Sequence, residues 1–290
     1  MLFGGKEKAP KPGKILKSLR RNEIAITAQK AEGVTPLCQS RFGGKPAVPK
    51  NFVWPRFEAE NYDGETANRP LSFLCQLSLS DIAAYDKEDL LPKTGLLLFF
   101  YEQESMCWGF DPADAGCARV YWFEDTEILG ETDFPDDLKA EYRVREYALS
   151  FHAGDSYPGF EELECHVDIK CDWDAYEAVM EQSGYAPDCG RHKLLGYANL
   201  IQGEMLTECE RGSRGLYSGD AKSYRETPEA VKADIQKSAK EWLLLFQMAS
   251  IQEDDGELMF GDLGNLYFYL RREDLKDRRF DKAWLVSQCY

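Results

Sequence analysis

The sequence predicts an α+β fold made mostly of antiparallel sheet, with a few helices and one shared core. Three observations support this prediction. Apolar segments with strand character outnumber helical patterns, most consecutive strands lack a helical crossover between them, and similar segments recur in the two halves of the chain. The chain has 290 residues, 43% of them hydrophobic and 30% charged, which is enough to bury a large core.

The first half of the chain reads as one helix followed by strands. A helix is expected over 14–21 and an alternating strand over 22–29. A loop rich in glycine and proline, 43–55, interrupts this pattern. Four more strands are then expected, over 70–77, 95–101, 118–125 and 141–151.

The second half mixes helices with strands. A helix is expected over 172–184, because Asp172 is a good N-cap residue and a glycine can end the helix. A further helix begins at Thr227, and the segment before it, 201–228, reads as a surface loop. Two apolar strands follow, over 242–248 and 264–270.

An internal repeat is visible in the order of these segments. Each half contains an entry loop with glycine, an apolar strand ending in glutamine, and an aromatic strand. The first half reads FGGKPAVP, FLCQL and GLLLFFY, and the second reads LLGYANLIQ, LLLFQM and GNLYFYL. We therefore predict a duplicated β-rich unit, with pseudo-repeats over about 40–150 and 190–290, in which Gln76 and Gln247 occupy equivalent places.

The distribution of charge divides the chain at a different place from the internal repeat. Residues 1–50 carry eleven Lys or Arg against three Asp or Glu, whereas the rest of the chain carries 24 against 48, a net charge of −24. This contrast predicts a basic N-terminal arm or helix over 1–21 and a single acidic α+β domain over 22–290. Such an acidic body favours a basic protein partner, because opposite charges accelerate encounter.

The basic arm has two interpretations. Nucleic acid would have to bind the arm itself, from Lys6 to Arg21, because the acidic body repels phosphate. The interpretation that we favour is a helix that packs Ile15, Leu16 and Leu19 on the body while its lysines face water.

Cysteine content and hydropathy predict a cytoplasmic protein. The nine cysteines are odd in number and irregularly spaced, which is typical of reduced thiols. The first residues lack the apolar segment of a secretory signal. No apolar run approaches the length of about 18 residues that a membrane-spanning helix needs.

No complete catalytic or cofactor motif is present. The glycine-rich segments match neither a phosphate-binding loop nor a nucleophile elbow, so the sequence predicts no catalytic residues and no cofactor. The only groups with metal-ligand character are Cys165, His166 and Cys171, and the pair Cys189 and His192. Their spacing is irregular for a structural zinc site, so we expect incidental thiols and no metal.

Five residues are candidates for binding. A glutamine that interrupts an apolar run must satisfy both sides of its amide, either with irregular backbone or with a ligand in a cleft. Aromatic and acidic side chains beside proline and glycine could likewise belong to the core and a turn, or line a pocket. The candidates are Trp54, Gln76, Gln202, Gln247 and Asp262.

Several blocks of the chain resemble the YwqG-like family, a bacterial domain of unknown function. In order along the chain they are SRFGGKPAVPKNFVWP, PLSFLCQLSL with LPKTGLLLFFY, ARVYWFED, LLGYANLIQGEM and the tail from GELMFGD to the end, so the resemblance extends from about residue 40. It implies an α+β fold with internal duplication and no established activity. Some relatives occur near secreted-toxin genes, which implies an immunity or partner-binding role by association.

Two functions are therefore expected from the sequence. The leading expectation is a protein-binding module, in particular an immunity protein that neutralises a basic toxin or effector. The alternative is an enzyme or small-molecule-binding protein that uses a cleft between the two pseudo-repeats.

Overall fold

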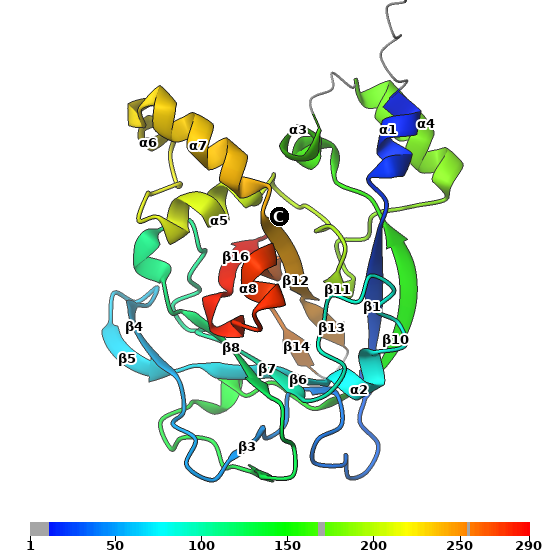
Figure 1. Cartoon of the computed structure of the whole chain (residues 1–290). Coiled ribbons are helices and arrows are strands. Elements are labelled where there is room, and N and C mark those ends of the chain that lie inside the picture. The colour runs from blue at the N-terminus through cyan, green and yellow to red at the C-terminus, as the bar shows by residue number, and fades with distance from the viewer. Residues whose placement is uncertain (1–11, 168–171, 254–255) are drawn as a thin grey trace, which may run out of the picture.

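The computed structural model describes residues 12–167, 172–253 and 256–290, and these residues form an α+β fold dominated by antiparallel sheet (Figure 1). The strands of the main sheet are β1 (Arg21–Lys30), β2 (Arg41–Phe42), β6 (Ser72–Ser78), β7 (Leu96–Tyr101), β8 (Ala118–Phe123), β10 (Tyr147–Ser156), β11 (His192–Leu195), β12 (Trp242–Ala249), β15 (Asn265–Arg271) and β16 (Trp284–Gln288). Three two-stranded ribbons pair β3 (Ala47–Pro49) with β9 (Leu129–Glu131), β4 (Arg56–Glu60) with β5 (Thr66–Pro70), and β13 (Ile251–Glu253) with β14 (Gly256–Leu258).

The helices of the described residues are short and lie around the sheet. They are α1 (Pro12–Ser18), α2 (Leu79–Ile82), α3 (Leu163–His166), α4 (Trp173–Ser183), α5 (Leu206–Ser213), α6 (Ala221–Glu226), α7 (Glu229–Ala239) and α8 (Arg272–Lys276). Single 3-10 turns are η1 (Pro112–Asp114), η2 (Ala140–Tyr142), η3 (Phe160–Glu162) and η4 (Phe280–Lys282). In the described part of the chain, no helix is both long and apolar enough to cross a membrane.

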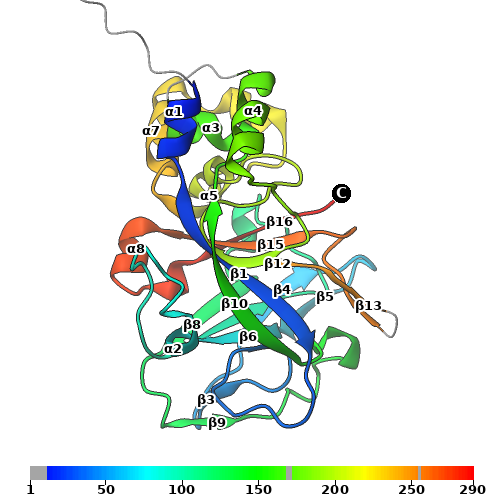
Figure 2. The same cartoon turned by 90° about the vertical axis from the view of Figure 1, so that its right-hand side faces the viewer.

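The ten strands of the main sheet follow the order β16-β15-β12-β11-β1-β10-β2-β6-β7-β8. The two longest strands, β1 and β10, lie in the middle and pair along their whole length, from Arg21 opposite Ser156 to Lys30 opposite Tyr147 (Figure 2). On either side, a short strand is followed by three longer ones. The sheet therefore has the same strand pattern when it is followed outward from β1 or from β10.

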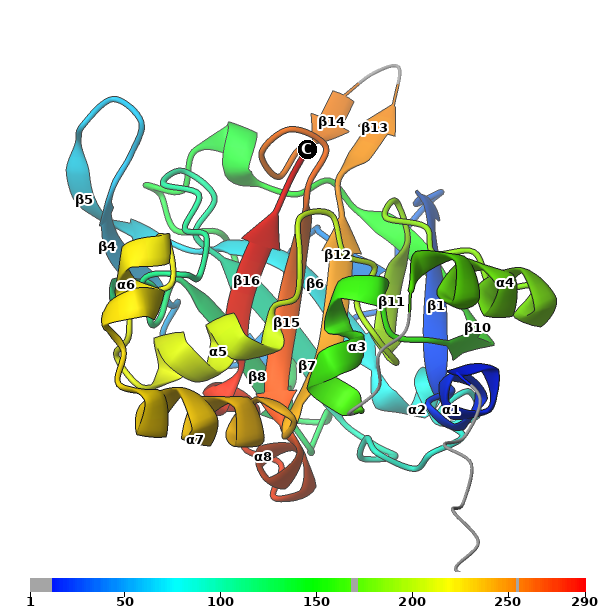
Figure 3. The ribbon, with the colours of Figure 1, turned by 90° about the horizontal axis from the view of Figure 1, so that it is seen from above.

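The two halves of the sheet pack face to face around one apolar core. Seen from above, β12, β15 and β16 cross over β6, β7 and β8 (Figure 3). The ring of Phe99 lies 4.7 Å from that of Phe246 and 5.1 Å from that of Phe268, and all three are buried. This closed apolar interior fills the place where the sequence had suggested a cleft between the pseudo-repeats.

The outer faces of the two halves are covered by different segments. On β12 and β15, the buried rings of Trp242 and Tyr269 pack under residues of α5 and α7. On β6 and β7, Phe73 and Phe100 pack under the loop that carries Phe52. Each half is therefore covered on both faces, which explains why these strands are apolar throughout and do not alternate.

The two glutamines have matching surroundings. Gln76 Oε1 accepts a hydrogen bond from Ala47 N at 3.0 Å, and its Nε2 donates to Gln39 O at 3.0 Å. Gln247 Oε1 accepts from Asn199 N at 3.0 Å, and its Nε2 donates to Arg191 O at 2.9 Å. In both strands the ladder is irregular just before the glutamine.

The backbone of the two entry loops also matches. Gly43 and Gly44 have φ angles of 58° and 69°, and Leu195 and Gly196 have 59° and 73°. Two consecutive residues in the left-handed region are uncommon, and they come directly after β2 in one half and at the end of β11 in the other. These correspondences favour the predicted duplication, which stays a prediction.

Several expected elements differ from the structure. The helix expected over 14–21 is α1, which ends at Ser18, and the loop expected over 43–55 contains β3. The strand expected over 141–151 starts only at Tyr147, because the segment before it forms η2 and the carbonyl of Val144 bonds to Gly44 N. The segment 201–228 is not a loop throughout, because it contains α5 and α6. Leu206 and Cys209, one turn apart, bury α5 against β12, a short apolar stripe that surrounding charged residues hide in the sequence.

The N-terminal helix docks on the body, as we favoured. α1 packs on α4, and Leu16 is fully buried among Tyr176, Val179 and Met180. Lys14 and Lys17 face solvent. The helix ends at Ser18, and the remaining lysines of the arm lie outside the described residues, so nucleic-acid binding by the arm stays a prediction.

We expect Gln247→Met and Gln76→Met to lower the free energy of unfolding by similar amounts, about 2–4 kcal/mol each. Methionine keeps the length of the side chain but leaves a buried N–H and a partly buried carbonyl without the amide that binds them. Urea unfolding followed by tryptophan fluorescence measures this change. Gln202→Met, at an exposed position, is the control and should change stability by less than about 0.5 kcal/mol. A loss at only one of the two buried positions would contradict their equivalence.

Candidate functional site

The five candidate residues do not share a cleft. Trp54 is half-buried, donates from Nε1 to Leu71 O at 2.8 Å, and contacts the rings of Phe52 and Phe100. Gln76 and Gln247 are fully buried in opposite halves, and their amides hold backbone groups on both the donor and the acceptor side.

Gln202 and Asp262 are exposed and lie beside the C-terminal residues. Gln202 Nε2 donates to Cys289 O at 2.9 Å, and Asp262 O accepts from Tyr290 N at 3.0 Å. Neither contact reaches the other candidates. A ligand role for the five residues stays a prediction. The side-chain amides of the glutamines and the Trp54 indole bond to backbone groups, and the bond at Asp262 uses its backbone oxygen.

Polar groups instead gather at an open groove of about 770 Å³ on the outer face of β1 and β10. Because side chains alternate along a strand, Ile24 and Ile26 enter the core while Glu23, Ala25 and Thr27 face the groove. The segment 183–192, between α4 and β11, forms one wall. Because Ala25, Ala153 and Gly154 have small side chains or none, the strand backbone forms much of the groove floor.

A buried carboxylate forms the inner end of the groove. Glu23 is 1% exposed, and its two oxygens accept from two cations: Oε1 from Arg191 Nη1 at 2.8 Å and Oε2 from Lys193 Nζ at 2.9 Å. Lys193 is completely buried, and this burial lowers the pKa of its ammonium, although the charge of Glu23 opposes the change. Breaking such a buried pair is costly, because it leaves one charge without a partner.

Asn199 ties this network to the rest of the second half. Its Oδ1 accepts from Lys193 Nζ at 2.8 Å and from Tyr185 Oη at 3.3 Å, and its Nδ2 donates to Asp188 O. Its backbone N–H is held by Gln247, as described above. Glu23 holds Arg191 at the groove, and Glu23 is itself held by Lys193 and, through Lys193, by Asn199. Because these groups are buried and bonded to one another, they fix the position of Arg191.

Burial keeps two titratable groups of the groove wall neutral at pH 7. Burial raises the pKa of Tyr185 to about 12, with a further contribution from the charge of Glu23. Burial lowers the pKa of His192 to about 4, so this imidazole is uncharged at neutral pH. Its Nδ1 accepts from Ala249 N at 3.1 Å, the same role that Ser40 Oγ has toward Ser78 N in the first half.

Carboxylates dominate the charged groups that line the groove. The carboxylates that line the groove are those of Glu23, Asp155 and Asp188, and the guanidinium that lines it is that of Arg191. Asp155 pairs with Arg20 at 3.2 Å, but both side chains are more than half exposed, and such pairs contribute little to stability. Asp188 is exposed and accepts from Gly190 N in a tight turn. Cationic groups of a ligand can therefore reach both of these carboxylates.

This arrangement is suited to binding more than to catalysis. Lys193 is enclosed by its two partners and cannot act as a nucleophile without losing them. Among the described residues, no group of three or more His, Cys, Asp or Glu is placed to hold a metal ion. Charge, hydrogen-bond donors and an open floor are what the groove offers to a ligand.

The cysteine and histidine pairs noted in the sequence have other partners. His166 Nε2 lies 2.6 Å from Glu162 Oε1, and Cys171 lies outside the described residues. Cys189 Sγ donates to Leu200 O at 3.4 Å, while His192 bonds to β12.

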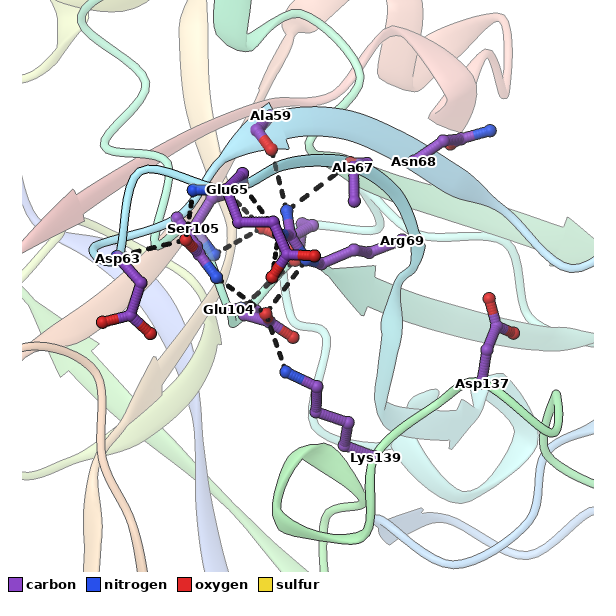
Figure 4. A network of polar contacts seen from close by, with 12 residues as sticks. Ala59, Asp63, Glu65, Ala67, Asn68, Arg69, Glu104, Ser105, Asp137 and Lys139 are labelled. Carbon is purple, nitrogen blue, oxygen red and sulfur yellow. Dashed lines mark hydrogen bonds and ion pairs between the residues drawn. The ribbon is translucent and has the colours of Figure 1, made fainter.

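A second polar cluster holds the β4–β5 hairpin against the following loops (Figure 4). Glu104 Oε1 accepts hydrogen bonds from Lys139 Nζ at 2.9 Å and from Asn61 Nδ2 at 3.0 Å, and it forms an ion pair with Arg69, whose Nε lies 3.0 Å away. Burial raises the pKa of Glu104, but these donors outweigh that effect and hold it below its usual value. The adjoining cavity measures only about 190 Å³, and the two cations that line it, Arg69 and Lys139, both pair with Glu104, so we assign this cluster to structure.

Sequence reasoning missed the groove because its parts come from three distant segments. One signal was available: Glu23 directly precedes the apolar residue Ile24 in one strand, and Lys193 directly precedes Leu194 in another. Opposite charges in two apolar strands indicate a buried ion pair, although neither the partner nor the groove could be derived from that pattern.

Residues 40–289 match the family described as "Domain of unknown function (DUF1963)". Because the match covers most of the chain, the chain belongs to this family. The narrower resemblance to YwqG-like proteins stays a prediction. No curated protein matches the sequence.

We expect the stability of the protein to fall between pH 7 and pH 4 partly through His192. Its pKa is about 6.5 in the unfolded chain and about 4 in the fold, so the unfolded state binds the extra proton first as the pH decreases. The loss assigned to this one group is about 3 kcal/mol. Urea unfolding at several pH values, compared with His192→Ser, measures it.

His192→Ser keeps an acceptor for the N–H of Ala249, as Ser40 does for Ser78, and removes the titrating group. The variant is expected to be less stable at pH 7 but to lose less stability on acidification. Parallel pH profiles for the two proteins would refute the assignment.

Proposed function

We propose that this protein is a binding module that holds an extended segment of a basic protein partner in the groove on β1 and β10. The observation that supports this most directly is the open groove of about 770 Å³, whose floor is strand backbone and small side chains. Sites for small molecules are usually enclosed and bury most of the ligand, whereas an open groove is suited to a polypeptide segment.

Charge supports a basic partner. Asp155 and Asp188 lie at the groove with exposed carboxylates, and residues 51–290 carry a net charge of −24. A partner rich in Lys or Arg would gain from both the local and the long-range field. The exposed contact between Arg20 and Asp155 can be exchanged for a contact with the partner at little cost.

Neutralisation of a basic toxin or effector domain is one form of this function. An immunity protein of this kind would use the groove to cover a cationic segment of its target. The proposal depends on the groove and not on the predicted cleft between the halves, because the core fills the space between them.

We expect a short fluorescein-labelled oligolysine peptide to bind the protein, with an affinity that falls as salt is added, because exposed charge pairs are screened. The double variant Asp155→Asn and Asp188→Asn should weaken binding about tenfold in low salt, since each pair contributes up to about 1 kcal/mol. Fluorescence anisotropy measures both effects.

Glu58→Gln with Glu60→Gln is the matched control. These two exposed carboxylates lie on the β4–β5 hairpin, and the change in net charge is the same. The control variant should bind the peptide as the unchanged protein does. Equal weakening by the two double variants would mean that net charge alone attracts the peptide, and the groove would lose its assigned role.

A further inference from the structure

Arg191 presents unused hydrogen-bond donors to the groove. Its side chain is 33% exposed, and in the described part of the chain Glu23 is the one carboxylate with which it forms an ion pair. That contact uses Nη1, and no other side-chain hydrogen bond of Arg191 occurs in the described part of the chain, so its remaining N–H donors are available to a ligand in the groove that it lines. Because Glu23 also neutralises Lys193, its single negative charge is shared between two cations.

Comparison of the two halves shows which residues of this network occur in both halves and which occur in one half alone. In the first half, Arg41 occupies the place of Lys193: it pairs with Gln76 across the strands, as Lys193 pairs with Gln247. The Nε of Arg41 lies 4.0 Å from Glu146, so the buried cation and its carboxylate occur in both halves.

Arg191 has no charged counterpart. The corresponding residue in the first half is Gln39, and the backbone carbonyls of both residues accept from the strand glutamine, Gln76 or Gln247. The fold therefore needs the carbonyl at this position and accepts glutamine as its side chain. The guanidinium is present only in the half that borders the groove, which points to a role in the groove.

A guanidinium with a free edge is well suited to a carboxylate, because two parallel N–H donors match its two oxygens. The other charged groups that line the groove and are exposed, Asp155 and Asp188, are acids and favour cations. A ligand that satisfies both ends carries one carboxylate together with basic side chains. A polypeptide has such a carboxylate at its C-terminus, and an open groove can accept the chain that precedes it.

We infer that the groove recognises the C-terminal segment of a basic polypeptide, with the terminal carboxylate on Arg191 and Lys or Arg side chains on Asp155 and Asp188. This inference rests on the proposed function and makes it narrower. Glu23, Lys193 and Asn199 act as positioning residues, because they hold Arg191 without contacting the ligand.

Three fluorescein-labelled oligolysine peptides of equal length test the inference. One ends in a free carboxylate, one in a C-terminal amide, and one in an amidated glutamate. By fluorescence anisotropy we expect the free acid to bind about tenfold more tightly than the amide, since hydrogen bonds between charged groups are strong. The amidated glutamate should bind no more tightly than the amide.

Two variants locate the effect. Arg191→Gln introduces the residue that the first half already has at this place, and it should abolish the preference for the free acid. Arg191→Lys keeps a cation beside Glu23 but has no planar fork, and it should lose most of the preference. Arg225→Gln, at an exposed position on α6, is the matched control and should retain it.

The outcomes are distinct. Equal binding of acid and amide, still weakened by the Asp155 and Asp188 double variant, would overturn the inference and leave the proposed function standing. No binding of any peptide would overturn both. Tight binding of the amidated glutamate would show that a side-chain carboxylate is recognised, and would overturn the assignment to a chain terminus. A preference that survives in Arg191→Gln would place the carboxylate elsewhere and overturn the role of Arg191.

Discussion

The pairing of β1 with β10 is the interaction on which the rest of the structure depends. These two strands join the half-sheets, and each bonds to the first short strand of one half, β11 or β2. One face of the pair contributes Ile24, Ile26 and Phe151 to the shared core. The opposite face is the floor of the groove. The same backbone pairing therefore closes the core and supports the binding surface, so a change in its register would move both.

The strands and the matching glutamines could be predicted because they depend on local patterns. Long apolar runs belong to strands covered on both faces, and a glutamine inside such a run has to satisfy its amide with nearby backbone. The structure has both features at Gln76 and Gln247, with the same type of partner. The pairing of β1 with β10 was not predicted, because pairing between residues more than a hundred positions apart leaves no local signal in the sequence.

The groove was missed for a related reason. Its floor comes from two central strands, its wall from a loop, and its charged end from Glu23 and Arg191, which are far apart in the sequence. Each segment alone reads as an ordinary strand or turn. Only the fold brings the carboxylate of Glu23 between Arg191 and Lys193. Only the comparison of the two halves distinguishes Arg191 from the residues that the fold itself requires.

Mapping of amide chemical shifts during titration of the isotope-labelled protein with the basic peptide that has a free C-terminus tests the central claim most directly. The account predicts that the largest shifts occur at the amides of Ala25, Gly154 and Gly190, which line the groove on its different elements. Largest shifts at the β4–β5 hairpin or at the C-terminal residues, with the groove amides unchanged, would contradict it.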